Sequence, residues 1–193
     1  SLAFLASLPL TAASYAEDVD YSEDPEKENA PAWDIENPPG PTHSQAIDVT
    51  EGTWISLDVS PDGSEIVFDL LGDLYRMPID GADGTDGLYP EKLTKGMAWD
   101  MQPRYSPNGK TIAFTSDRNG NWDVFVMSVD GGPAMQVTFD NAHELHPTWS
   151  PDGKKLCYCR FNVRTSEWEL WTVSFDRPGM RSFICEGMFP RWS

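Results

Sequence analysis

The sequence predicts an all-β fold, a β-propeller of four-stranded antiparallel blades, of which the chain covers three and leaves the ring incomplete. A Ser-Pro-Asp/Asn-Gly turn occurs at residues 60–63, 106–109 and 150–153, at intervals of 46 and 44 residues. Each turn is followed by a strand in which apolar residues alternate with a period of two. This repeat length, with frequent turns, is typical of a propeller blade, whereas helical repeats are shorter and have fewer turn signals.

The repeated turn has a clear mechanical basis. Proline fixes φ at the first corner, Asp or Asn tolerates the second, and Gly accepts the positive φ at the exit. The strand after each turn carries an apolar pair on one face: Ile66 and Phe68, Ile112 and Phe114, and Leu156 and Tyr158.

The remaining strands of each blade follow in the same order. A second turn is expected near residues 71–72, 119–120 and 162–166, and an acid then begins the third strand at Asp73, Asp123 and Glu169. A third turn and a short last strand come next, the strand at residues 92–94, 136–138 and 183–185. The next first strand begins at residues 102, 146 and 189. No helix is expected in this region.

The N-terminal part differs in composition. Residues 1–16 are read as a partial signal peptide, because an apolar run from Leu2 to Leu10 precedes small residues at Ser14 and Ala16. A buried helix or strand is the alternative, and the run is too short to span a membrane. Residues 17–46 are predicted to be an acidic, disordered linker. Residues 47–50 resemble a last strand without a blade, which suggests a longer parent protein.

Charge and cysteine content exclude several function classes. A net charge of −17, from 14 basic and 31 acidic residues, excludes a nucleic-acid partner. No phosphate-binding loop, catalytic constellation or Cys-x-x-Cys pair occurs, so no cofactor or metal is predicted. Whether the protein is an enzyme stays open. Cys157 and Cys159 lie on one strand and Cys185 on another strand of the same blade. A bridge to Cys185 or three free thiols would fit, and we expect no disulfide because the third strand separates the other two.

Polar residues on or just before the first strands are the candidate partner-binding residues, because that strand lines the channel of a propeller. The alternative is that they only solvate a wet channel. Residues 143–146 do not form a zinc-protease helix, since the second His is at i+3 and Pro147 follows it. We also expect Asp117 and Arg118 to form either a local ion pair or a turn-stabilising pair. Interblade packing is expected of Trp149, Trp168, Trp171 and Trp192. The candidate binding residues are Asp100, Gln102, Arg104, His143, His146 and Arg191.

Residues 47–193 resemble the TolB-like propeller repeats of exported bacterial proteins. The resemblance rests on the three turns, the Phe-Thr-Ser-Asp-Arg run at 114–118 and the Asp-Gly-Gly turn at 130–132. It implies a periplasmic or secreted, non-catalytic propeller that binds a protein or peptide partner as a scaffold or envelope component. The alternative is the propeller domain of a larger hydrolase, amidohydrolase-like or serine-peptidase-like, with its catalytic domain beyond residue 193. One fold hosts many activities, so the resemblance specifies the fold more closely than the function.

Overall fold

The computed structural model describes residues 34–38, 40–41, 43, 52–81, 89–175, 177 and 179–192. The predictions of a signal peptide at residues 1–16 and of a strand at 47–50 lie outside these residues, as does most of the predicted linker.

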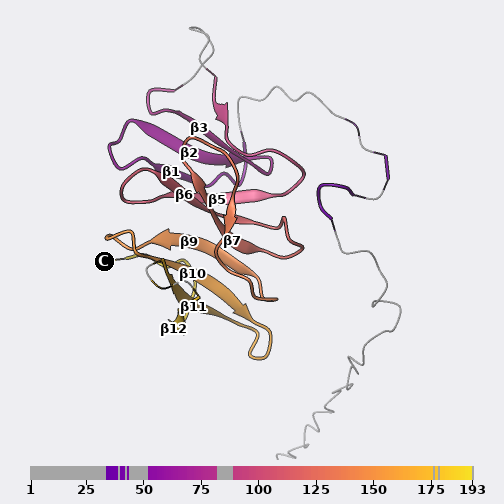
Figure 1. The fold of residues 1–193 in the computed structure, drawn as a ribbon, viewed down its shortest axis with the longest axis vertical. Helices are drawn as coiled ribbons and strands as arrows, with labels where there is room; N and C mark the ends of the chain where they lie inside the picture. The colour runs from indigo at the N-terminus through magenta and orange to yellow at the C-terminus, as the bar shows by residue number, and fades with distance from the viewer. Residues whose placement is uncertain are drawn as a thin grey trace, which may run out of the picture. The chain divides into compact units, whose positions relative to one another are not determined.

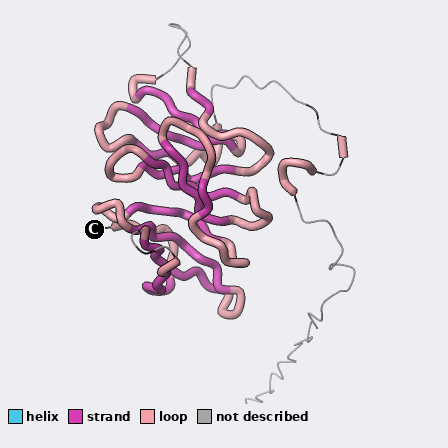
Figure 2. Tube along the Cα trace, viewed as in Figure 1, coloured by secondary structure: helices cyan, strands magenta, loops and turns pink. Residues whose placement is uncertain are grey.

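The described chain forms three four-stranded antiparallel sheets and contains no helix (Figures 1 and 2). Each sheet is a meander in which consecutive strands pair, so the predicted all-β blades are confirmed. Among these residues there is therefore no helix that could cross a membrane. The first blade contains β1 (Leu57–Val59), β2 (Glu65–Leu70), β3 (Asp73–Pro78) and β4 (Glu91–Lys92); the second contains β5 (Asp100–Tyr105), β6 (Thr111–Ser116), β7 (Asp123–Ser128) and β8 (Met135–Gln136); the third contains β9 (Glu144–Trp149), β10 (Lys155–Asn162), β11 (Glu167–Ser174) and β12 (Arg181–Glu186).

The repeated turns join the first and second strands of each blade, as predicted. In the second blade, the Ser106 hydroxyl donates to Asn108 Oδ1 at 2.8 Å and accepts the Thr111 N–H at 3.0 Å. The same two bonds recur around Ser60 and Ser150. Hydrogen bonds from Ser60 and Ser64 lower the pKa of Asp62 to about 2, so this turn carries an ionised acceptor.

The apolar core lies between neighbouring blades. Because side chains alternate along a strand, β6 presents Phe114 to the first blade and Ala113 to the third. One core cluster contains Val67, Leu74, Leu93, Tyr105, Ile112, Phe114, Phe125 and Met127, and the other contains Ala113, Val124, Val126, Leu156, Tyr158 and Val173.

Two of the tryptophans expected between blades donate to a main-chain carbonyl of an inner strand, and the bond of Trp149 joins the third blade to the second. Trp149 Nε1 donates to the Arg104 carbonyl at 3.1 Å, and Trp192 Nε1 donates to the Thr148 carbonyl at 3.2 Å. Trp171 packs against the core cluster between the second and third blades. Trp168 instead packs on Phe161 of its own blade.

The three cysteines are free, as expected. Cys159 of β10 lies opposite Leu170 of β11, and Leu170 lies opposite Cys185 of β12. The width of one strand therefore separates Cys159 from Cys185.

Candidate functional site

The inner strands share an irregular position. Gln102, His146 and Phe189 each precede a proline and each have a positive φ, of 58°, 55° and 57°. The pairing registers of β5 and β9 shift at this point, which identifies a bulge. Non-glycine residues rarely adopt this conformation, so surrounding bonds must hold it.

Those bonds come from the preceding blade. The Gln102 N–H donates to Asp69 Oδ2 at 2.7 Å, and the Phe189 N–H donates to Cys159 Sγ at 3.3 Å. Asp69 and Cys159 occupy the same place on the second strands of their blades. In the second blade this place is Thr115, whose hydroxyl donates to Gln102 Oε1 at 3.1 Å.

In the second blade, Gln102 rather than Thr115 accepts the N–H of the next bulge. Its Oε1 also accepts the His146 N–H at 2.8 Å. The carboxylate of Asp69, the amide of Gln102 and the thiol of Cys159 therefore play the same part in three successive blades. Each accepts the N–H of the next bulge and holds that bulge against the blade before it.

These bulges line a pocket of about 890 Å³, called here the hairpin-side pocket. It lies at the end of the blades that carries the β2–β3 and β6–β7 hairpins, away from the Ser-Pro-Asp-Gly turns. Most of its lining is apolar, and four of the apolar side chains are well exposed: Trp54 is 98% exposed, Leu71 64%, Trp99 56% and Phe189 65%. The pocket lining comprises Thr53, Trp54, Ile55, Ser56, Asp69, Leu70, Leu71, Gly72, Trp99, Met101, Gln102, Trp122, His146 and Phe189.

The polar groups of the pocket are few and held in place. The Asp69 carboxylate accepts the N–H groups of Ser56 and Gln102, at 2.9 and 2.7 Å. The His146 ring packs on Phe189, with ring centroids 4.6 Å apart. Burial, together with the charge of Arg104, lowers the pKa of His146, so the imidazole is neutral at pH 7 and can donate and accept hydrogen bonds.

The structure brings two of the six predicted site residues, Gln102 and His146, into this pocket. Arg104 donates to the carbonyls of Leu57 and Pro103. His143 is exposed, and its Nδ1 accepts the Trp122 N–H at 3.5 Å.

Asp100 and Arg191 lie outside the pocket. Arg191 is exposed, whereas Asp100 is only 1% exposed and lies 2.8 Å from Arg118. The ion-pair form of the expected Asp117–Arg118 pair is therefore wrong, because the Asp117 carboxylate instead accepts the Trp99 N–H at 2.8 Å. Both residues lie in the turn that is closed by the Gly120 N–H bond to the Asp117 carbonyl, at 2.9 Å.

Sequence reasoning missed Trp99, Trp122 and Leu71 as pocket residues. Trp99 precedes an inner strand, and the other two lie in second-to-third strand hairpins. A meander places both kinds of segment at one end of the blades, so this common location was the available signal. No group of three or more His, Cys, Asp or Glu side chains in the described ranges is arranged to hold a metal ion.

Comparisons with known proteins show related sequences of greater length. The chain is 31% identical over 108 residues to the uncharacterized protein Atu1656 of Agrobacterium fabrum, covering 54% of this chain and 35% of the relative. It is 41% identical over 73 residues to the uncharacterized peptidase YuxL of Bacillus subtilis, covering 37% of this chain and 11% of the relative. The chain thus spans about a third or less of these relatives.

The fold and the family follow from two further matches. The structure of a putative TolB from Agrobacterium tumefaciens matches with a TM-score of 0.59 and 24% identity, over 72% of this chain and 53% of that one. At this identity the likeness shows a shared propeller fold. The model of the Tricorn protease N-terminal β-propeller domain matches residues 56–185, which is more than half of the chain. The chain therefore belongs to the Tricorn protease N-terminal β-propeller domain family.

Proposed function

We propose that this chain is the propeller of an exported, non-catalytic binding protein, and that its hairpin-side pocket receives an apolar side chain of a protein or peptide partner. The observation that carries the proposal is the gathering of exposed Trp54, Leu71, Trp99 and Phe189 around one pocket. Exposed apolar residues that cluster in this way are typical of interaction sites, whereas single exposed ones are not.

The size and chemistry of the pocket suit a polypeptide. Its volume of about 890 Å³ falls within the range of ligand pockets. Aromatic side chains supply large contact areas at interfaces, and a few fixed polar groups set orientation. Here the amide of Gln102 and the neutral imidazole of His146 can bond to the main chain of an extended peptide.

Replacing pocket tryptophans should weaken peptide capture. We expect a random-peptide phage library to enrich sequences with aromatic or aliphatic residues on the wild-type protein. Trp99→Ala and Trp122→Ala should each weaken the selected peptides about tenfold or more, as for interface hot spots. The affinities can be measured by fluorescence anisotropy.

Phe139 provides a matched control, because it is 67% exposed and lies outside the pocket lining. Phe139→Ala should bind the selected peptides as the wild type does. Equal affinities in all four proteins would reject the pocket as the binding site.

Export is supported by the apolar segment before Ala16 and by the likeness to a TolB structure. We expect the mature protein to begin at Glu17, as N-terminal sequencing of the cell-envelope and secreted fractions would show. A mature chain that retains residues 1–16 would contradict export by this signal.

The second candidate is the propeller domain of a larger hydrolase. The family match to a protease domain and the relative described as a peptidase favour it. The pocket would then select polypeptide substrates for a separate catalytic domain. Labelling of the full gene product by a fluorophosphonate probe would support a serine peptidase, and no labelling together with peptide capture would support the binding protein.

A further inference from the structure

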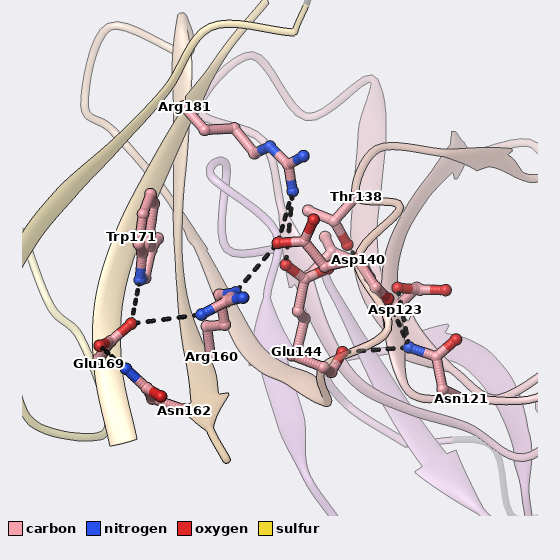
Figure 3. A network of polar contacts seen from close by, with 12 residues as sticks. Asn121, Asp123, Thr138, Asp140, Glu144, Arg160, Asn162, Glu169, Trp171 and Arg181 are labelled. Atoms are coloured by element: carbon pink, nitrogen blue, oxygen red, sulfur yellow. Dashed lines mark hydrogen bonds and ion pairs between the residues drawn. The ribbon is translucent and has the colours of Figure 1, made fainter. Parts of the chain in front are cut away.

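Three carboxyl groups meet between the second and third blades (Figure 3). Asp123 begins β7 and is 1% exposed, and Glu144 begins β9 and is fully buried. Asp140 approaches them from the connection between β8 and β9. Burying ionised carboxylates is costly unless each is paired and hydrogen-bonded.

The nearby arginines pair mainly with other acids. Arg181 Nη1 lies 2.9 Å from Asp140 Oδ2 but 3.8 Å from Glu144 Oε1. Arg160 lies 3.0 Å from Asp140 and 3.5 Å from Glu169. Within the described chain, neither carboxyl oxygen of Glu144 has a hydrogen-bond donor.

In the second blade, the position equivalent to Glu144 carries an acid whose charge is neutralised by an arginine. Asp100 begins β5 as Glu144 begins β9, and both N–H groups donate to the preceding blade's hairpin, at Gly72 O and Trp122 O. Asp100 has Arg118 at 2.8 Å. In the third blade the place of Arg118 is taken by Asn162, whose amide donates to Glu169 instead.

A proton is the ligand that completes this site. Asp123 accepts a hydrogen bond from Gln136 Nε2 at 2.9 Å, whereas the two oxygens of the buried Glu144 carboxyl have no donor among the described residues. A proton on Glu144 supplies one, and it leaves Arg181 to Asp140. We propose that Glu144 keeps this proton in the folded protein, and that the protonated carboxyl group is a pH-dependent lock between the second and third blades.

The electrostatic surroundings support the lock. Burial raises the pKa of Glu144 from 4.5 to about 8, and the charges of Asp140 and Asp123 add to the rise. Burial likewise raises the pKa of Asp123 from 3.8 to about 6, so the two groups titrate as a pair. Three charged or titratable groups act on the pair directly: Asp140 from the β8–β9 connection, Tyr158 from β10 and Arg181 from β12. Arg160 of β10 pairs with Asp140 and with Glu169 of β11 at the edge of this group.

Folding stability at this site depends on pH because the pKa of Glu144 differs between the folded and the unfolded chain. Between pH 4.5 and about 8, the folded protein retains a proton on Glu144 that the unfolded chain releases. Folding stability at this site therefore falls as the pH rises through that window, and the full penalty is present above pH 8. The carbonyl of Trp122 accepts the Glu144 N–H at 2.7 Å, so loosening here reaches a residue of the hairpin-side pocket. The effect on binding, though not the lock, rests on the proposed function.

The lock is tested first in the wild-type protein. Infrared spectroscopy at pH 7 should show a carboxylic-acid C=O band that disappears above pH 8. Hydrogen exchange in β9 and in residues 119–124, corrected for intrinsic rates, should lose about tenfold protection or more between pH 6 and pH 9, because one pKa unit is a factor of ten. Absence of both changes would overturn the proposal even if no variant could be produced.

Glu144→Gln tests whether Glu144 carries the proton, since an amide resembles a protonated carboxyl group. It should remove most of the band and make exchange in β9 independent of pH between 6 and 9. The matched control is Asp100→Asn, which removes the ion-pair partner of Arg118 at every pH. This variant should keep the carboxylic-acid band and the pH dependence of exchange. A pH dependence in Glu144→Gln equal to that of the wild type would refute the lock. Loss of peptide capture at pH 9 in the wild type, but not in Glu144→Gln, would show that the effect of the proton reaches the pocket. Unchanged capture together with the expected loss of exchange protection would show that the effect is confined to the interface between the blades.

Discussion

Phe114→Ala should destabilise the propeller by about 3–5 kcal/mol, the usual cost of removing a fully buried phenylalanine. The Phe114 side chain is 0% exposed and belongs to the core between the first and second blades. It stacks on Phe125 at 6.0 Å, and the Arg118 guanidinium lies 5.4 Å from its ring centroid. Truncation would leave a cavity and deprive Arg118 of part of its support beside Asp100. Chemical denaturation monitored by circular dichroism measures the change.

The second variant for this prediction is Phe114→Leu, which keeps most of the volume. It should cost clearly less than Phe114→Ala, because the penalty grows with the cavity that remains. Phe139→Ala, at an exposed position, should change the stability by about 0.5 kcal/mol or less. A loss after Phe114→Ala as small as that after Phe139→Ala would mean that this core does not hold the two blades together.

The blade architecture could be predicted from the sequence because its signals are local. The hydroxyl of Ser106 and the side chain of Asn108 stabilise a turn within a few residues of each other. Period-two alternation then assigned Ile112 and Phe114 to one face. The separation of Cys159 from Cys185 also followed, since a meander fixes the order of strands.

The site was predicted only in part because it depends on which segments meet in space. Gln102 and His146 could be placed on inner strands, but Trp99 and Trp122 reach the same pocket from separate connections. Asp117 and Arg118 were expected to pair because they are neighbours in the sequence. Arg118 instead extends over the Phe125 ring, at 4.8 Å, toward Asp100, a direction that only the packed sheet defines.

The positions that hold the bulges were also hidden from sequence reasoning. Asp69, Thr115 and Cys159 occupy one structural position but share no chemistry beyond a small polar or polarisable side chain. The link between blades became visible only when each was seen beside an inner strand of the next blade. These bonds lead to the second large expected effect.

Asp69→Ala should destabilise the first two blades by about 1–3 kcal/mol for each backbone donor left without an acceptor. Asp69 is 6% exposed, and its two oxygens accept the N–H groups of Ser56 and Gln102. Gln102 has a positive φ of 58°, so loss of its acceptor also frees a strained residue. Its side chain bonds to His146 and Thr115, and we therefore expect the disturbance to reach the hairpin-side pocket.

A graded series distinguishes this role from simple loss of volume. Asp69→Asn keeps one carbonyl oxygen and turns an amide toward the other donor, so it should lose about half as much stability as Asp69→Ala. Asp152→Ala removes an acid from an exposed turn and controls for the change in net charge. Hydrogen exchange should show faster exchange of the Ser56 and Gln102 amides in both Asp69 variants but not in Asp152→Ala. If the two Asp69 variants were equally stable, and as stable as the wild type, the bulge would be held by its pairing with β6 rather than by the preceding blade.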